Sequence, residues 1–143
     1  VSVPERPLAE RHPLKILLTE DNPVNQRVAL LMLERLGYRA ERAGNGREAV
    51  EACQRTPFDV VLMDMEMPEM DGITATQQII ALTAPRPPWI IALTAHAMKD
   101  DRDRALRSGM DEFLSKPFRP AQLADALRRA YLGLVARSLE PRA

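Results

Sequence analysis

The chain has 143 residues and a mass of 16.1 kDa, with 20 basic and 20 acidic side chains and a formal net charge of +0. This length fits one domain, and the shares of hydrophobic (45%) and charged (28%) residues are those of an ordinary globular protein. We therefore exclude a second catalytic domain, a collagen, a disulfide scaffold and a disordered chain. The balanced charge also argues against non-specific nucleic-acid binding.

Short apolar runs alternate with amphipathic stretches from Lys15 onward, a pattern typical of repeated strand–helix units around a buried parallel sheet. Residues 16–18 are apolar throughout and too few for a helix, so they predict the first strand. Asn22 is the expected cap of a helix that has Pro23 at its first position and ends at Gly37. Apolar residues at three- and four-residue spacing give this helix an apolar face: Val24, Val28, Leu31 and Met32.

Four further strands and four further helices follow in alternation, which makes an α/β fold of five strand–helix units. The strands are expected at residues 38–43, 58–63, 89–93 and 112–115. The helices are expected between the 44–46 turn and Pro57, from 73 to 82, from 98 to 107 and from about 120 to 135.

The regions outside these units define the expected domain boundaries: a linker at residues 1–13, a domain at 14–135 and a charged tail at 136–143. Because the chain starts at Val1 rather than Met, we expect it to be a segment of a longer protein. The single cysteine, Cys53, fits a reducing compartment. No apolar run approaches the ~20 residues of a membrane helix, so a cytoplasmic location without a membrane segment is predicted.

Polar residues stand at the ends of four of the predicted strands, where a parallel sheet forms its sites. Thr19, Glu20 and Asp21 follow the first strand, and the third, fourth and fifth strands are followed by Asp64, Thr94 and Lys116. No turn separates Asp64 from its strand, so we expect this carboxylate to be partly buried and to need a partner.

Three clustered carboxylates repel one another unless a cation lies between them. Because no histidine or cysteine belongs to the cluster, the predicted cation is Mg²⁺, which prefers oxygen ligands. A carboxylate beside a metal, an ammonium and a hydroxyl is suited to nucleophilic attack on a phosphoryl group. Asp64 is the predicted nucleophile, with Lys116 and Thr94 stabilising the transferring oxygens.

Four segments resemble the receiver domain of two-component response regulators: LLTEDNPVNQ from Leu17, VVLMDMEMPEMDG from Val60, ALTAHA from Ala92 and FLSKPF from Phe113. The four motifs occur in the order found in that family, and the resemblance covers about residues 14–134. It implies a flavodoxin-like (βα)5 fold, a doubly wound parallel sheet with strand order 2-1-3-4-5.

The resemblance also implies a role for each site residue. Asp64 would accept phosphate from a phosphohistidine, and the chain would catalyse its own aspartyl phosphorylation and dephosphorylation. Mg²⁺ would be held by Glu20, Asp21, Asp64 and the backbone carbonyl of Glu66. Thr94 would contact the phosphoryl group and shift on activation together with Phe113, the switch aromatic. Lys116 would pair with the phosphate, and the Lys116–Pro117 bond is a candidate cis peptide.

The EDNPVNQ and LTAHAM segments are most similar to receivers fused to hybrid sensor histidine kinases. The implied partner is a histidine kinase or a histidine phosphotransfer domain. An effector would dock either on the last strand with the fourth and fifth predicted helices, or on the first and fifth predicted helices. No nucleic-acid partner is expected.

Two other functions fit parts of the pattern. A docking module that works without phosphorylation would use the same surfaces, although it would not need the complete acid set and Lys116. A phosphatase of the haloacid dehalogenase type also uses a strand-end aspartate with Mg²⁺. That family expects a second aspartate two residues after the nucleophile, where this chain has Glu66.

Overall fold

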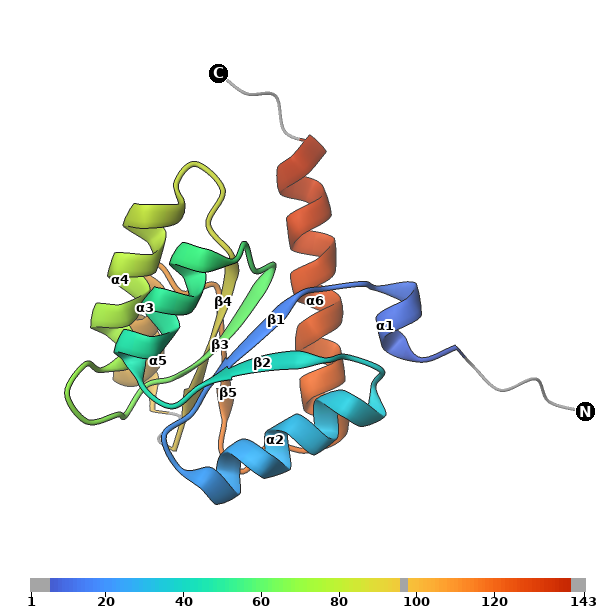
Figure 1. Cartoon of the computed structure of the whole chain (residues 1–143), viewed down its shortest axis with the longest axis horizontal. Helices are drawn as coiled ribbons and strands as arrows, with labels where there is room; N and C mark the ends of the chain where they lie inside the picture. Colours follow the sequence, from blue (N-terminus) through green and yellow to red (C-terminus); the bar gives the residue numbers. More distant parts are fainter. Residues whose placement is uncertain (1–5, 96–97, 140–143) are drawn as a thin grey trace, which may run out of the picture.

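Five parallel strands form one sheet between two layers of helices in the computed structural model, which describes residues 6–95 and 98–139 (Figure 1). The strands are β1 (Ile16–Thr19), β2 (Ala40–Ala43), β3 (Val60–Asp64), β4 (Trp89–Thr94) and β5 (Glu112–Ser115). The helices are α1 (Leu8–Arg11), α2 (Pro23–Arg35), α3 (Gly46–Arg55), α4 (Gly72–Thr83), α5 (Lys99–Arg107) and α6 (Pro120–Leu139).

The strand order is β2-β1-β3-β4-β5 and every neighbouring pair is parallel, which confirms the predicted flavodoxin-like order. Strands β1 and β3 are buried along their whole length because helices cover both faces of the sheet. In the register of these strands, Ile16 lies opposite Val60 and Asp64 lies opposite Leu93. The carboxyl ends of β1, β3 and β4 therefore meet at one edge.

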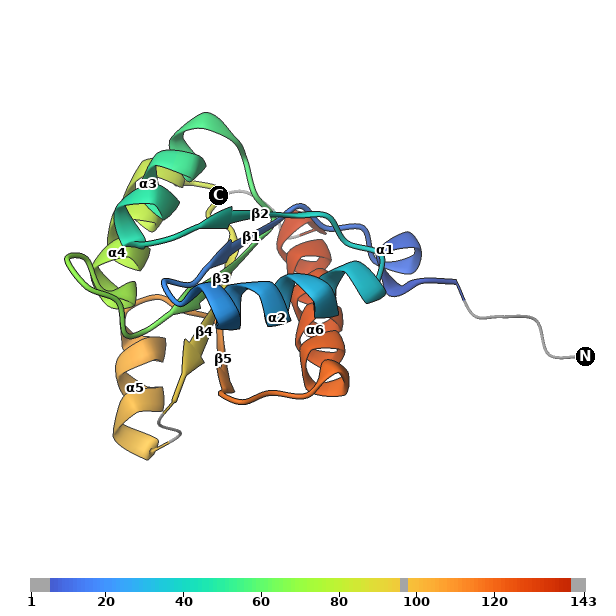
Figure 2. The same ribbon diagram turned by 60° about the horizontal axis from the view of Figure 1, so that its bottom comes forward.

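Helices α2 and α6 cover one face of the sheet, and α3, α4 and α5 cover the other (Figures 1 and 2). Alternate strand residues feed two separate cores. Ile16, Leu18 and Leu62 belong to the core under α2 and α6, whereas Leu17 and Met63 belong to the core under α3, α4 and α5. Within the described residues, no helix is both long and apolar enough to cross a membrane.

The predicted cap of α2 is confirmed. The Asn22 side chain accepts hydrogen bonds from the backbone N–H groups of Val24 (2.9 Å) and Asn25 (3.1 Å), and Pro23 occupies the first helical turn. This cap starts α2 two residues after the last residue of the acidic pair, so it also fixes the loop that carries Glu20 and Asp21.

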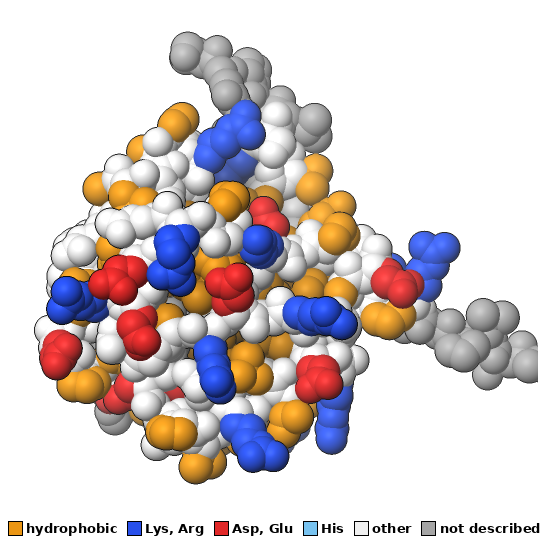
Figure 3. Space-filling model, in the orientation of Figure 1, with side chains coloured by type: hydrophobic (Ala, Val, Ile, Leu, Met, Phe, Trp, Pro, Cys, Tyr) orange, Lys and Arg blue, Asp and Glu red, His pale blue; other side chains and the backbone are white. Residues whose placement is uncertain are grey.

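The apolar face predicted for α2 is mostly exposed, which corrects the interpretation of its spacing. Val24 is 70% exposed, and Val28 and Leu31 are each 47% exposed. The helix instead buries Ala29 and Leu33. Because α2 carries apolar residues on more than one side, spacing alone could not select the side that packs on the sheet. In Figure 3 hydrophobic side chains reach the surface along the lower edge, where α2 lies, among interspersed positive and negative groups.

Part of the predicted linker is packed on the domain. Helix α1 lies within residues 1–13, and its Leu8 side chain is only 3% exposed in the core under α2 and α6. The backbone N–H of Ala9 donates to the carbonyl of Leu36 at 3.0 Å. Gly37 (φ +92°) makes this approach possible, because a Cβ atom there would lie 3.0 Å from the Cβ of Pro7.

His12 continues this packing beyond α1. The Tyr38 hydroxyl donates to the His12 carbonyl at 2.6 Å, and the His12 ring stacks on Tyr131 of α6 with 4.7 Å between ring centroids. The packed unit thus begins before the predicted boundary at residue 14. Burial of the apolar Leu8 side chain and stacking of the His12 ring stabilise the packed arrangement of this segment relative to a solvated linker.

Helix α6 runs to Leu139, four residues beyond its predicted end at 135. Its last turns still contact the sheet. The Arg137 guanidinium lies over the Trp89 ring, 4.7 Å from the centroid, and pairs with Asp111. Gly133 lets the helix approach this ring, since a Cβ atom there would lie 2.2 Å from the ring atom Cζ3 of Trp89. These contacts extend the helix into the predicted tail.

Candidate functional site

Asp64 is the last residue of β3 and lies at the edge of the sheet predicted to hold the site. Asp64 is only 2% exposed. The Oδ1 atom accepts a hydrogen bond from the backbone N–H of Glu66 at 3.1 Å, which fixes the carboxylate relative to the loop that follows. A buried strand ending in an acid thus places one oxygen pair at a defined point of this edge.

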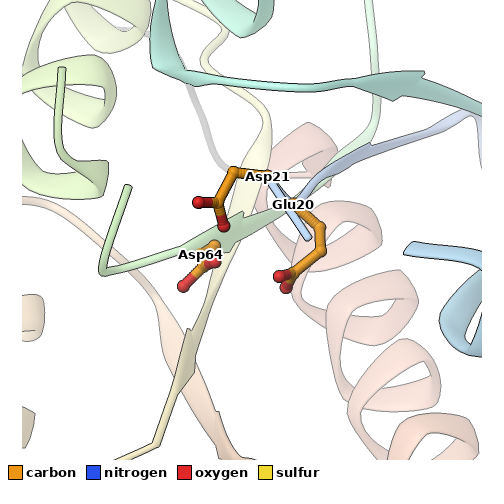
Figure 4. A group of neighbouring side chains, drawn as sticks. All are labelled: Glu20, Asp21 and Asp64. Atoms are coloured by element: carbon orange, nitrogen blue, oxygen red, sulfur yellow. The ribbon is translucent and has the colours of Figure 1, made fainter. Parts of the chain in front are cut away.

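Glu20 and Asp21 follow β1 and join Asp64 at this edge. Glu20 is 3% exposed, whereas Asp21 is exposed to solvent. The three residues each offer a carboxylate oxygen, and these oxygens lie within 4.8 Å of one another. Figure 4 shows the three side chains next to one another, with the Asp21 carboxylate pointing toward Asp64. The structure therefore brings together the three acids that the sequence placed at neighbouring strand ends.

Lys116 reaches this cluster from the loop after β5. Its Nζ atom lies 2.9 Å from Oε2 of Glu20 and 3.1 Å from Oδ1 of Asp64. The backbone N–H of Lys116 donates to the Thr94 carbonyl at 2.7 Å, so the loop is anchored to the end of β4. The peptide bond to Pro117 is cis, as predicted. The Lys116 ammonium thus partly neutralises the two buried carboxylates of Glu20 and Asp64.

Burial and neighbouring charges shift the titration of the central pair. Burial raises the pKa of Asp64 from 3.8 to about 6, and the charge of Glu20 acts in the same direction, against the Glu66 N–H and the charge of Lys116. Burial works to lower the pKa of Lys116, but its hydrogen bond with Glu20 and the charge of Asp64 raise that pKa above its usual value. Lys116 is therefore charged at neutral pH, and an ionised Asp64 is costly without more positive charge.

The predicted switch residues, Thr94 and Phe113, lie on β4 and β5. Thr94 ends β4 and is 6% exposed. Phe113 is partly buried and packs on the core under α3, α4 and α5. Thr94, predicted to follow its strand, is the last residue of β4, and Phe113 lies within β5 as predicted. The ALTAHA motif extends past this point, and its His96 lies outside the described residues.

Gly72, the last residue of the VVLMDMEMPEMDG segment, shapes the site directly. A Cβ atom on Gly72 would lie 2.4 Å from the carbonyl oxygen of Asp64 and 3.0 Å from the Cα of Met65. The start of α4, capped by Asp71, therefore packs directly on the backbone that follows the acid. The Asp-Gly pair after a strand could have indicated this close approach.

Gln26 is a second residue that sequence reasoning missed. Its Nε2 atom donates to the carbonyl of Glu20 at 3.2 Å from the first turn of α2. This contact ties the acidic loop to the helix. A glutamine in a helix carries no pattern that would have revealed it.

The donor set fits a hard divalent cation. The three acids offer only oxygen ligands, and no histidine or cysteine belongs to the group of possible ligands within the described residues. A cation placed among them would stabilise the ionised form of Asp64, whose pKa is raised mainly by burial and further by the charge of Glu20. A buried carboxylate beside an ammonium and a cation-binding acid pair is an arrangement that can form an acyl phosphate.

Known proteins match most of the chain. Residues 16–128 match the family described as "Response regulator receiver domain". The sensor histidine kinase GacS of Pseudomonas protegens is 40% identical over 143 residues, covering 98% of this chain and 15% of that protein. Hybrid signal transduction histidine kinase H of Dictyostelium discoideum is 44% identical over 126 residues, covering 85% of this chain and 9% of that protein. The chain thus spans a small part of these relatives.

Solved receiver structures share the fold. The receiver domain of sensor histidine kinase PA1611 from Pseudomonas aeruginosa PAO1 is 45% identical, with a TM-score of 0.76 over 84% of this chain and 98% of that one. That structure has a magnesium ion coordinated in its active site cleft. The receiver of Saccharomyces cerevisiae Ssk1, crystallised with the histidine phosphotransfer protein Ypd1, is 28% identical, with a TM-score of 0.78 over 83% of this chain and 89% of that one.

The sequence match, the strand order and the clustered acids agree with one another. The family that matches residues 16–128 is not the haloacid dehalogenase family of the alternative reading. The chain belongs to the response regulator receiver domain family.

Proposed function

We propose that the chain is the phosphoacceptor receiver of a two-component phosphorelay, with Asp64 taking the phosphoryl group from a phosphohistidine. One observation carries this proposal: Asp64 is buried at the sheet edge, with Lys116 at 3.1 Å and two further acids beside it. A module that only docked a partner would have no use for this costly arrangement, so the geometry favours chemistry over docking alone.

The transfer forms one bond and breaks one. An oxygen of the ionised Asp64 attacks phosphorus, the bond from phosphorus to the donor imidazole nitrogen breaks, and the imidazole leaves with its electron pair and takes a proton. Lys116 stays protonated and stabilises the negative charge that accumulates on the phosphoryl oxygens. The Thr94 hydroxyl donates a hydrogen bond to one of these oxygens. The same residues position water for the later hydrolysis of the acyl phosphate.

Mg²⁺ fits the proposed site as its cofactor. Glu20, Asp21, Asp64 and the backbone carbonyl of Glu66 would hold it. When bound, the ion supplies positive charge that neutralises the acids and attracts the phosphoryl group. The oxygen-only donor set and the magnesium-bound receiver of PA1611 support this assignment.

The wider context of the chain is proposed from its relatives. Because GacS and kinase H are histidine kinases, we assign the chain to a hybrid sensor histidine kinase that acts in the cytoplasm. Its partner would be a histidine kinase or a histidine phosphotransfer domain, a choice supported by the Ypd1–Ssk1 receiver complex. Phosphorylation would then alter Thr94, Phe113 and Pro117 and change the surface offered to an effector.

The exposed side of α2 is the proposed docking surface for the phosphodonor. Val24, Val28 and Leu31 form an apolar row with exposures of 70%, 47% and 47%, and α2 starts next to the acidic loop. A helical phosphotransfer domain resting on this row would bring its histidine to Asp64. The surface formed by α5, β5 and α6 is then available to bind an effector.

The proposed chemistry is tested by intact mass after incubation with Mg²⁺ and acetyl phosphate. We expect one phosphoryl adduct on the wild-type chain, and none on Asp64→Asn or with EDTA in excess. Asp125→Asn serves as a matched control, because Asp125 is an exposed acid on α6. If the adduct persists in Asp64→Asn, the acceptor is wrong; if the folded wild type gives none, the docking module becomes the better function.

Substituting Val28→Glu should separate docking from chemistry. A charge in the middle of the apolar row should slow phosphotransfer from a phosphorylated histidine phosphotransfer domain by about tenfold or more, because a buried unpaired charge weakens an interface. Adduct formation with acetyl phosphate should be unchanged. Leu106→Glu, at a 51% exposed position of α5, is the control and should leave the transfer rate as in wild type. The opposite pattern would move the donor to the α5 surface.

A further inference from the structure

Arg102 of α5 makes a specific contact with the predicted switch aromatic. Its guanidinium carbon lies over the Phe113 ring, 4.3 Å from the centroid. Arg102 is exposed, whereas Phe113 is partly buried against the core under α3, α4 and α5. The Phe113 ring is therefore in contact with both the core and this cation.

The sheet register places this ring beside Thr94. Ala92 lies opposite Phe113, and Thr94 lies opposite Ser115. Side chains alternate along a strand, so residues two apart point to the same face, and Thr94 and Phe113 are diagonal neighbours on adjoining strands. A shift of Thr94 toward Asp64 would open space next to the ring.

Phenylalanine has no hydroxyl group, so no hydrogen bond can define where this ring rests. The negative face of the ring attracts a guanidinium, and at an exposed position this contact shifts an equilibrium constant by a factor of about two to five. The contact with Arg102 is thus a directional interaction that can hold the ring in its present place.

We propose that Arg102 is a positioning residue that holds the Phe113 ring in its present position and thereby opposes activation. The inference rests on the proposed function, in which Thr94 moves toward a phosphoryl group on Asp64. If the ring then moves into the space behind Thr94, it leaves the guanidinium, and the contact is lost. Because Arg102 makes this contact in the resting conformation and not in the activated one, it lowers the population of the activated conformation.

The first test compares Arg102→Gln with wild type in the acetyl phosphate assay. Loss of the charge should raise the rate of adduct formation about two- to fivefold, because a larger fraction of the chain already has the activated arrangement. Arg104→Gln is the matched control, an exposed arginine two residues along the same helix. Arg102→Lys keeps a cation and should restore most of the wild-type rate.

The second test links the effect to the ring. In a Phe113→Leu background, Arg102→Gln should change the rate by less than in the Phe113 chain, because no aromatic face remains. By NMR, the Arg102 side-chain N–H should show the ring-current shift of a group above an aromatic face, and this shift should disappear when beryllofluoride and Mg²⁺ are added as a phosphoryl mimic.

The outcomes distinguish the two proposals. An Arg102→Gln rate equal to or below that of wild type overturns the positioning role, and so does an effect of the same size in the Phe113→Leu background. In either case the wild type still forms its adduct and the proposed function stands. If the folded wild type forms no adduct at all, the proposed function fails and the positioning role fails with it.

Discussion

Asp64→Asn should make the metal-free domain more stable at pH 7, by about 1–3 kcal/mol, although it removes the proposed acceptor. Burial raises the pKa of Asp64 from 3.8 to about 6. The ionised side chain is therefore less stable in the folded chain than in the unfolded chain. Asparagine has nearly the same shape and no charge to desolvate. Chemical denaturation in EDTA at pH 7 measures the difference.

The pH dependence of the free energy of unfolding provides a second test of this prediction. A carboxyl group whose folded pKa is raised favours the folded state when protonated, so its contribution is present below about pH 4 and is lost as the pH rises through about 6. The stability of wild type relative to Asp64→Asn should therefore decrease over this window and stay low above it. A stability difference between the two chains that is the same at pH 4 and pH 7 would show that folding does not shift the pKa of Asp64.

Magnesium should act in the opposite direction to the substitution. A cation that binds the folded chain stabilises it by mass action, so Mg²⁺ should raise the melting temperature of the wild type. The increase should be smaller for Asp64→Asn, which lacks one carboxylate ligand. Asp125→Asn, at the exposed α6 position, should respond to Mg²⁺ as wild type does. A magnesium effect of equal size in all three chains would place the ion elsewhere.

The central strands could be predicted because their residues leave few choices. Runs such as Val60–Met63 are apolar on both sides, which suits a strand covered on both faces and little else. Helix α2 was less predictable, since Val24 and Val28 have the spacing of a buried face and yet point to solvent. Sequence spacing reports that an apolar row exists; whether the sheet or a partner covers it depends on tertiary packing.

The positions of the acids could also be predicted, because parallel strands end at the same edge and Asp64 follows its strand directly. The contacts that bridge the cluster could not. Lys116 lies between Glu20 and Asp64, although it is 96 residues from Glu20 in the sequence. Its position depends on how the loop after β5 is anchored to Thr94. The approach of Gly72 to the Asp64 carbonyl likewise comes from the packing of α4.

Lys116→Met should destabilise the metal-free domain at pH 7 by about 2–3 kcal/mol. The substitution keeps the length of the side chain but removes the ammonium that lies 2.9 Å from Glu20 and 3.1 Å from Asp64. Two carboxylates that are 3% and 2% exposed then lose their common partner and repel each other. Denaturation in EDTA measures the loss, and Lys99→Met, at an exposed position of α5, should cost little.

A double-mutant cycle assigns this loss to the cluster. In Asp64→Asn, one of the two carboxylates is already neutral, so adding Lys116→Met should cost at least about 1 kcal/mol less than it does in the wild-type background. The loss should also shrink near pH 5, where one carboxyl group can take up a proton in place of the ammonium. Additive effects at both pH values would mean that Lys116 stabilises the fold through its aliphatic stem and not through the acids.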